Sequence, residues 1–409
     1  MSTEWLCGWA ARDILEGMGW DKHSAGPPAN FSITYPAPSV PTGIAMPAAL
    51  TYGGATQGNG GQWLNFQVQD GTLQGFIRPT TNPIEPGTVK PQIAGICGTG
   101  GNGAFLSWGA DKKFYVVDFL GTTVWLGPSV TTMDAASPQW YVLQLQYNIS
   151  EQTVTLRIYK ESDGFTTPET LGPATASDFS IGPSIQVIRR GQLSGNPTAG
   201  WHWTNELLEL GATWPDPKTS LAAVAVNSGP GADNQTSWVR SDTGLDDATN
   251  EYTLIDEIPP DDTDYLKRTV NVATLLQYYG HAAGLVPAGQ TPLAVQAVAR
   301  NKSVTNAQIY HQCGLKLSAS TILGTRRRVG EVGSGVAGAW AYPSYVCSSV
   351  KPGGGAWTIA DVDNVRPGHG SGTATTGEAQ CAHHLIYAAY TGAAPPQVPT
   401  ERRRAHQVI

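Results

Sequence analysis

Two glutamates near residue 206 are the best candidates in this sequence for acid–base chemistry. Glu206 and Glu209 are separated by two leucines, and glycoside hydrolysis uses two carboxyl groups, one as the acid and one as the nucleophile or base. Their stretch has the character of a β-strand, in which residues three apart point to opposite faces of the sheet. We therefore interpret both as solvent-facing carboxylates at the rim of a sheet, and we predict no catalytic residue and no enzyme.

Three tryptophans flank these glutamates and form the candidate glycan-binding group. They are Trp201, Trp203 and Trp214. A flat apolar ring can stack on the face of a pyranose, so these side chains could bind a glycan of a host surface. The same residues suit a tryptophan-rich hinge that packs two domains together, and we favour that interpretation.

Charged clusters elsewhere suit contacts between protein molecules. The acidic cluster Asp261, Asp262 and Asp264 could offer oxygen ligands to Ca²⁺, but it lacks the glycine and the spacing of an EF-hand loop. The basic clusters are Arg326, Arg327 and Arg328, followed near the C-terminus by Arg402, Arg403 and Arg404. We predict solvated turns or assembly contacts, such as the acidic cluster against the arginines of a neighbour, and no metal or cofactor.

The cysteines and histidines show no metal-binding or catalytic spacing. The five cysteines are far apart, and no CxxC pair or Cys/His cluster is present. We expect mainly buried thiols; Cys313, Cys347 and Cys381 lie in expected strands of one domain, where a pair could meet, and the sequence leaves disulfides open. His383 and His384 are adjacent, so on a strand they point to opposite faces and cannot easily chelate together.

The composition favours an all-β protein. The chain has 409 residues, of which 48 are glycine and 29 are proline, spread along its length. Frequent turn residues suit many short strands better than long helices. Charged residues make up only 14% of the chain, against about 25% in an ordinary soluble domain.

Charge and hydropathy argue against two classes of partner. The formal net charge is −7, so there is no basic field to displace counterions from phosphates, and we expect no nucleic acid. No apolar run reaches the ~20 residues of a membrane span, and the N-terminal stretch lacks a basic segment followed by an apolar core. We expect no membrane partner and synthesis in the cytoplasm.

One expected hairpin gives the first half its fold class. Residues 140–147 (WYVLQLQY) and 153–159 (TVTLRIY) both alternate, with a hairpin-sized loop between them. Within residues 50–212 this pattern resembles the concanavalin-A-like (laminin-G-like) jelly rolls. That family includes lectins, glycoside hydrolases and structural modules, so the fold settles no function. A hydrolase of the family would carry an E-x-D-x-(x)-E motif, and Leu208 stands where its central Asp belongs.

Three segments beyond a proline-rich break at 214–218 carry a second resemblance. They are residues 252–265 (YTLIDEIPPDDTDY), 294–296 (AVQ) and 354–364 (GGAWTIADVDN). We expect 252–258 to be a strand that ends at the two prolines, and 357–363 to be a short helix capped near Thr358. These segments resemble a virion structural protein of tailed bacteriophages.

The two resemblances imply an architecture and a role. The predicted fold is all-β, with two β-sandwich (jelly-roll-like) domains at residues 1–215 and 216–390, few short helices, and a Pro-rich basic arm at 391–409. The implied function is assembly of a phage virion, most directly in the tail (fibre, tip or tail-decorating protein), with other virion proteins and symmetry copies as partners. A capsid decoration protein and a glycan-binding host-recognition module are the alternatives.

Overall fold

The computed structural model of the chain describes most of its residues. They are residues 2–7, 20–21, 31–34, 37–54, 59–62, 70–84, 90–98, 103–118, 121–176, 185–190, 198–229, 238–244, 250–256, 263–270, 275–304, 309–328, 340–372 and 377–392.

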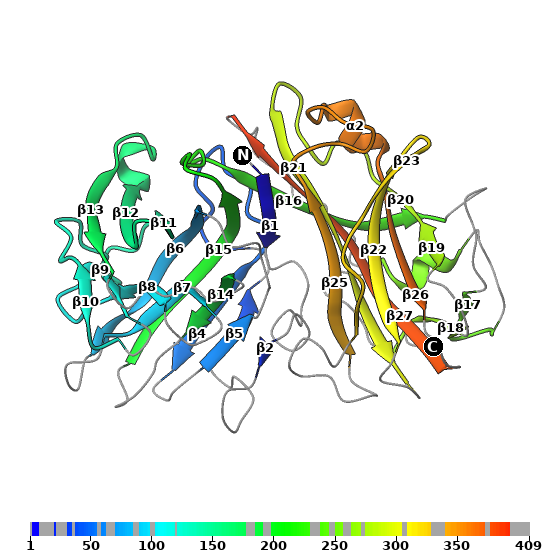
Figure 1. The fold of residues 1–409 in the computed structure, drawn as a ribbon, viewed down its shortest axis with the longest axis horizontal. Helices are drawn as coiled ribbons and strands as arrows, with labels where there is room; N and C mark the ends of the chain where they lie inside the picture. The colour runs from blue at the N-terminus through cyan, green and yellow to red at the C-terminus, as the bar shows by residue number, and fades with distance from the viewer. Residues whose placement is uncertain are drawn as a thin grey trace.

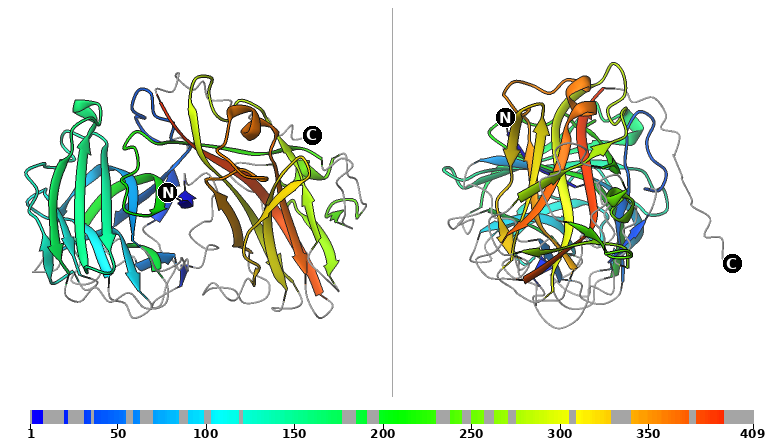
Figure 2. Two further views of the ribbon diagram at one scale, coloured as in Figure 1. Left: turned by 45° about the horizontal axis from the view of Figure 1, so that its top comes forward. Right: turned by 90° about the vertical axis from the view of Figure 1, so that its right-hand side faces the viewer.

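Two halves lie side by side along the long axis of the molecule (Figures 1 and 2). Strands up to residue 210 build the first half, strands from residue 220 build the second, and the proline-rich break lies in the connection. Within the described ranges each half has two sheets of antiparallel strands. The predicted all-β class, with sandwiched sheets and few short helices, is confirmed; the domain boundaries at 215 and 390 stay predictions.

The first half stacks one sheet on another. In spatial order the first sheet contains β13 (Glu169–Thr175), β12 (Thr153–Lys160), β11 (Tyr141–Asn148), β6 (Gly71–Ile84), β15 (Thr198–Leu210), β4 (Ala49–Gly54) and β3 (Phe31–Thr34), and β1 (Ser2–Cys7) also pairs with β15. The second contains β10 (Val124–Leu126), β9 (Phe114–Val117), β8 (Gly103–Trp108), β7 (Gln92–Gly98), β14 (Ile185–Arg190), β5 (Asn59–Gln62) and β2 (Trp20–Asp21). A 3-10 turn, η1 (Glu161–Asp163), follows β12.

The second half repeats the two-sheet plan. Its larger sheet contains β17 (Val239–Arg240), β18 (Leu266–Val270), β27 (Gly377–Thr391), β16 (Ser220–Ser228) and β20 (Gly280–His281), with β21 (Thr291–Ser303) on β27 and β25 (Trp340–Ser348) on β21. Its smaller sheet contains β19 (Leu275–Tyr278), β26 (Arg366–Gly372), β22 (Tyr310–Leu317) and β23 (Ser320–Leu323), and β24 (Arg327–Arg328) pairs with β22. The two helical segments are η3 (Glu251–Leu254) and α2 (Ile359–Asn364).

The predicted hairpin is present in the first sheet, between β13 and β6. β11 and β12 pair antiparallel within the predicted residues, with Leu145 opposite Leu156. Alternation sends Leu143 and Leu145 into the sandwich, where they share a hydrophobic cluster with Leu106 and Val116 of the opposing sheet. Burial of each such side chain contributes about 1.5–3 kcal/mol.

The same hydrophobic cluster continues into the second half. It contains Leu207 of β15 together with Leu221 of β16, Val298 of β21 and Leu385 of β27. Figure 1 shows β1 standing between the halves, where it pairs with β15. A continuous apolar core holds two units in one relative position, unlike a polar domain interface.

β27 serves two cores because its side chains alternate. Leu385 and Tyr387 belong to the shared cluster, whereas Ile386 and Ala388 belong to a second cluster between the two sheets of the second half. Neighbouring strand residues point to opposite faces, so a strand buried on both sides reads as a continuous apolar run. β27 is therefore the central element of the second half.

The expected strand at residues 252–258 is wrong. Glu251–Leu254 forms the 3-10 turn η3 instead, and residues 257–262 lie outside the described part of the chain. Leu254 and Ile255 are buried in the second cluster from this turn. A short apolar run fits a buried turn as well as a strand, and its periodicity cannot separate the two.

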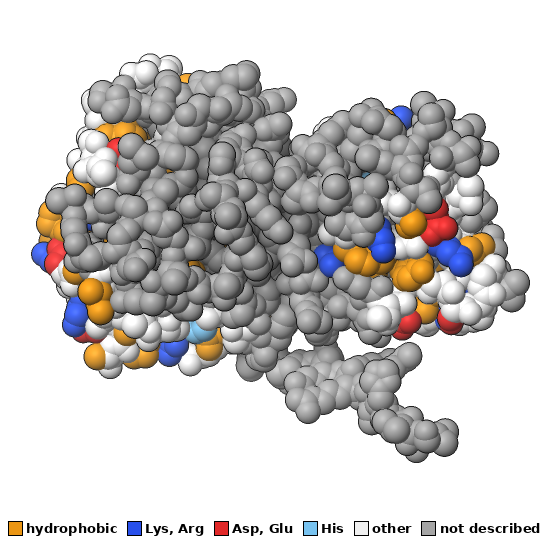
Figure 3. All heavy atoms as spheres, turned by 90° about the horizontal axis from the view of Figure 1, so that it is seen from below, with side chains coloured by type: hydrophobic (Ala, Val, Ile, Leu, Met, Phe, Trp, Pro, Cys, Tyr) orange, Lys and Arg blue, Asp and Glu red, His pale blue; other side chains and the backbone are white. Residues whose placement is uncertain are grey.

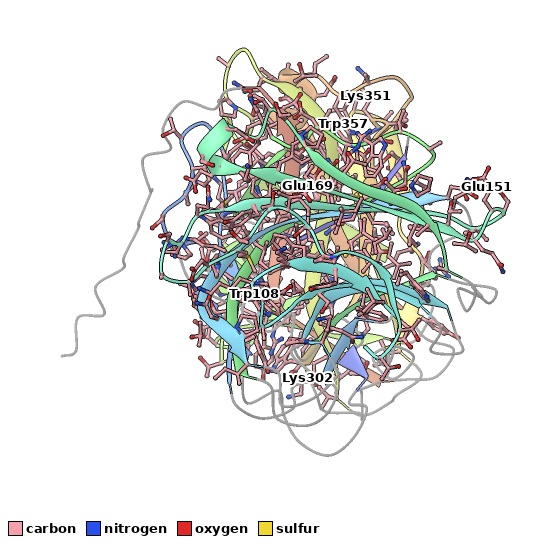
Figure 4. The ribbon with its side chains drawn as sticks, turned by 90° about the vertical axis from the view of Figure 1, so that its left-hand side faces the viewer. Trp108, Glu151, Glu169, Lys302, Lys351 and Trp357 are labelled. Atoms are coloured by element: carbon pink, nitrogen blue, oxygen red, sulfur yellow. The ribbon has the colours of Figure 1, made fainter. Side chains whose placement is uncertain are left out.

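The predicted short helix is confirmed as α2. Thr358 is its N-cap, and its hydroxyl accepts from the backbone N–H of Asp361 while the Asp361 carboxylate accepts from the backbone N–H of Thr358, which makes a capping box. Lys351 donates to Asp361 at 2.9 Å. Figure 4 shows Lys351 and Trp357 together at this end of the molecule and Lys302 at the opposite end.

The described surface mixes side-chain types. On the face seen in Figure 3, acidic, basic and hydrophobic side chains are interspersed over both halves wherever the residues are described. A mixed surface of this kind sets up no large field of one sign there. Among the described residues, none of the helices has the length and apolar character that crossing a membrane requires.

Candidate functional site

Glu206 and Glu209 are buried, which corrects the prediction of solvent-facing carboxylates. Glu206 has no exposed surface and Glu209 is 5% exposed. β1 pairs with β15 alongside both residues, so this part of β15 lies inside the sheet instead of at its rim. The indole N–H of Trp203 donates to Oε2 of Glu206 at 2.8 Å. The carboxylate therefore serves as a buried acceptor for a core tryptophan.

A β-bulge interrupts β15 just before these glutamates. The pairing of β15 with β6 shifts between Thr204 and Leu207, and Asn205 has a φ of 44°. Nδ2 of Asn205 donates to the carbonyl of Ala45 at 2.7 Å and to that of Thr219 at 3.4 Å. The bulge thus ties β15 to the chain before β4 and to the connection just before β16, in keeping with the positional role of bulges in sheets.

Trp201 and Trp203 are core residues, which corrects their place in a glycan-binding group. They are 1% and 0% exposed. Tyr52 stacks on Trp201 with ring centroids 5.4 Å apart, and the ring of Trp203 lies so close over Gly75 that any Cβ there would overlap it. A sugar can stack only on a ring face that it can reach. Neither ring offers one.

Trp214 lies in the connection between the halves and is half-buried. The guanidinium of Arg157 on β12 stands over its ring, 4.0 Å from the centroid. A cation–π contact at a partly exposed site contributes about 0.5–1 kcal/mol. The contact holds the connection against the first sheet, as a hinge residue would.

Two buried glutamines hold the backbone of the connection. Nε2 of Gln144 donates to Oε1 of Gln74 at 2.6 Å and to the carbonyl of Pro215 at 2.8 Å. Nε2 of Gln74 donates to the carbonyl of Asp216 at 3.3 Å. Both glutamines have no exposed surface. Because buried amides need partners, these bonds define where the connection lies.

Replacement of Gln144 by leucine should loosen the connection. The change removes both donated bonds and leaves Oε1 of Gln74 and the carbonyl of Pro215 each without one, at a cost of about 1–3 kcal/mol for a buried unsatisfied group. We expect limited trypsin digestion to cut the Gln144→Leu variant after Lys218 several-fold faster than the wild type. Mass spectrometry of the fragments measures the two cleavage rates.

Gln146→Leu is the matched control. Gln146 lies on the same strand, is only partly buried, and donates to the carbonyl of Ala212 at 3.0 Å in a more exposed setting. Its loss should leave cleavage after Lys218 close to the wild-type rate. Equal rates for the wild type and both variants would show that the glutamines do not hold the connection.

The predicted assembly residues are only partly described. Asp264 is half-buried just before β18. Arg326 is exposed and donates through Nε to Oε1 of Gln312 at 3.3 Å, and Arg327–Arg328 forms β24. The residues outside the described part are Asp261, Asp262, Arg402, Arg403 and Arg404. Their role in assembly stays a prediction.

A cluster of three buried histidines lies in the second half, and the sequence analysis missed it. His311 of β22, His369 of β26 and His384 of β27, here termed the histidine cluster, have no exposed surface. The Nδ1 atoms of His369 and His384 are 3.5 Å apart. Nδ1 of His311 lies 2.8 Å from the hydroxyl of Ser371, and its Nε2 lies 3.1 Å from the hydroxyl of Ser303.

Two aromatic rings pack against this cluster. Tyr279 stacks on His369 with ring centroids 5.4 Å apart and planes 5° apart, and Trp238 meets His369 edge-on at 5.0 Å. Burial lowers the pKa of His311 to about 3 and that of His384 to about 3. The pKa of His369 is lowered well below its usual value, first by burial and then by its histidine neighbours. All three rings are neutral at pH 7.

Three of the five cysteines lie in the described part of the second half. No disulfide joins Cys313, Cys347 and Cys381 to one another. Burial raises the pKa of the Cys381 thiol, which keeps it protonated and unreactive. Within the described ranges, no group of three or more His, Cys, Asp or Glu side chains is placed to hold a metal ion.

The solved structures that match part of this chain include lectins and a sialidase. Lectin I-B4 of Griffonia simplicifolia is 8% identical, covers 47% of this chain and 97% of its own, and has a TM-score of 0.28. A Bauhinia forficata lectin in complex with GalNAc is 8% identical, with coverages of 51% and 98% and a TM-score of 0.28. Trypanosoma rangeli sialidase is 14% identical, with coverages of 49% and 31% and a TM-score of 0.28.

Likeness at these TM-scores carries no argument about what this chain does. No protein family matched the sequence, and no curated protein matched it. The all-β fold stands on the strands and sheets of the chain itself.

Proposed function

We propose that this chain is a structural component of a tailed-bacteriophage virion, most directly a tail-associated protein, in which the two halves act as one rigid block. The observation that carries the proposal is the hydrophobic cluster that runs from Leu207 in the first half to Leu385 in the second. An assembly part must hold its contact surfaces at a fixed distance and angle. A shared apolar core supplies that rigidity, because relative motion would expose it.

The segments that resemble phage virion proteins contribute to a single core. Leu254 and Ile255 come from the first segment, Val295 from the second, and Trp357 and Val362 from the third, and all five belong to the second hydrophobic cluster. Residues of this kind specify a fold and carry no reaction chemistry. The resemblance therefore supports a relationship in architecture, which suits a building block.

The side chains that suggested chemistry in the sequence support the same proposal. Glu206 accepts a hydrogen bond from Trp203 inside the first half, and Trp214 packs on Arg157. A hydrolase would need two carboxyl groups that flank a bound sugar in a reachable site. Here the groups stabilise strands and the connection between the halves.

Fractionation of phage particles tests the proposal. Particles purified on a density gradient from the producing host, then washed in high salt, should retain this chain at a constant ratio to the other particle proteins by quantitative mass spectrometry. Recovery of the chain only in the soluble fraction, with particles complete without it, would contradict the proposal. If the particles retain the chain, an antibody label on the tail or on the capsid distinguishes a tail protein from a capsid decoration protein.

A glycan array tests the remaining alternative. The intact protein should bind no glycan through Trp201 or Trp203, because both rings are buried. Specific binding by a folded protein would favour a host-recognition module that uses other residues, with a host-surface glycan as its partner.

A further inference from the structure

We propose that the histidine cluster makes the second half sensitive to acid: this half stays packed while the rings of His311, His369 and His384 are neutral, and it opens when they take up protons. The inference rests on the geometry of the second half and does not depend on the proposed function.

The facing pair tolerates one proton between its two Nδ1 atoms. His369 and His384 approach through Nδ1 at 3.5 Å with rings 5.1 Å apart, so one nitrogen can donate while the other accepts. A further proton would place two N–H groups face to face. Nε2 of each ring has no hydrogen-bond partner and is buried, so a proton there would gain no acceptor.

His311 adds a third site in the same interior. Its two ring nitrogens meet the hydroxyls of Ser303 and Ser371. Hydroxyls can donate or accept, so these bonds survive protonation of the ring. The charge itself remains in a fully buried position, and an unpaired buried charge is costly.

The surroundings offer little negative charge in the described part of the chain. Glu251 of η3 is a buried carboxylate that accepts from the amide of Gln277, and Gln277 pairs with His369 across β19 and β26. On β18, Arg268 lies on the same side as buried Leu266 and is 5% exposed. The guanidinium adds positive charge to this half.

The other titratable neighbours include two thiols and His383, and His383 lowers the pKa of His384 further, after burial. Cys313 on β22 and Cys381 on β27 are buried thiols, and burial raises the pKa of Cys381 so that it stays neutral. His383 lies next to His384 but points to the opposite face of β27, the face that carries Leu385 of the shared cluster.

The sign of the pH effect follows from the lowered pKa values. Each histidine has a pKa near 6.5 in the unfolded chain and a lower one in the folded chain, about 3 for His311 and His384. The unfolded or opened state therefore binds more protons below pH 6.5, and stability falls as the pH drops from 6.5 towards 3. Between pH 7.5 and 4.5 each such ring raises the opening equilibrium constant about 100-fold.

Hydrogen exchange of the whole chain tests the proposal. After correction for intrinsic rates, protection of amides in β22, β26 and β27 should fall about 10⁴-fold between pH 7.5 and 4.5, the product of the ~100-fold effects of His311 and His384. Protection of β11 and β12 in the first half should change much less. The triple variant His311→Gln, His369→Gln, His384→Gln should lose most of the pH dependence in the second half.

His202→Gln provides the matched control. His202 is a partly buried histidine of the first half that bonds to Thr51, and burial lowers its pKa to about 4. The variant should leave the pH response of β22, β26 and β27 intact. An equal loss of protection in both halves of the wild type, or a folded triple variant with the full response, would overturn the proposal. If the triple variant does not fold, the comparison of the halves in the wild type decides.

Discussion

Replacement of Trp203 by alanine is expected to lower the free energy of unfolding by about 3–5 kcal/mol, the usual cost of deleting a buried Trp or Phe side chain. The ring has no exposed surface and fills the space above Gly75. Its loss also removes the N–H that bonds to the buried carboxylate of Glu206. Urea unfolding followed by circular dichroism measures the change.

Trp214→Ala separates a core role from a ligand role. Trp214 is half-buried against Arg157, so its loss should cost about 1 kcal/mol or less. If Trp203→Ala kept wild-type stability while it abolished binding to a glycan, Trp203 would be a ligand contact and its assignment to the core would fail.

Leu385→Ala should destabilise the whole molecule, because Leu385 belongs to the cluster that both halves share. The side chain has no exposed surface, and buried Leu→Ala changes cost about 2–5 kcal/mol. We expect calorimetry to show one transition for the wild type and one transition at lower temperature for the variant, since the two halves share this part of the core.

Leu323→Ala makes the same chemical change at the surface. Leu323 of β23 is 53% exposed, and surface substitutions usually change stability by about 0.5 kcal/mol or less. Two separate transitions, with only the transition of the second half shifted by Leu385→Ala, would show that the halves fold independently. That result would remove the basis for a rigid block.

Local signals in the sequence predicted the local structure well. The hairpin of β11 and β12 followed from alternation and a short loop, and α2 followed from Thr358 before an apolar, acid-bearing segment. Both depend on residues close together in the chain. The strand predicted at residues 252–258 was wrong because a short apolar run fits a buried turn as well as a strand.

The features that the sequence did not predict depend on pairing between strands that are far apart in the chain. Glu206 and Glu209 are buried because β1, about two hundred residues earlier, pairs beside them. The histidine cluster forms because β22 and β26 pair within one sheet and face β27 of the other. The sequence held one usable signal, since His311 and Cys313 are two apart and so share a strand face, but the partner strands were not visible in it.

A cryo-electron microscopy map of particles from the producing host tests the central claim most directly. The account predicts density for this chain in several symmetry-related copies, with the two halves in the same relative orientation in each. Particles whose map has no density for the chain, or copies whose halves adopt different relative orientations, would contradict it.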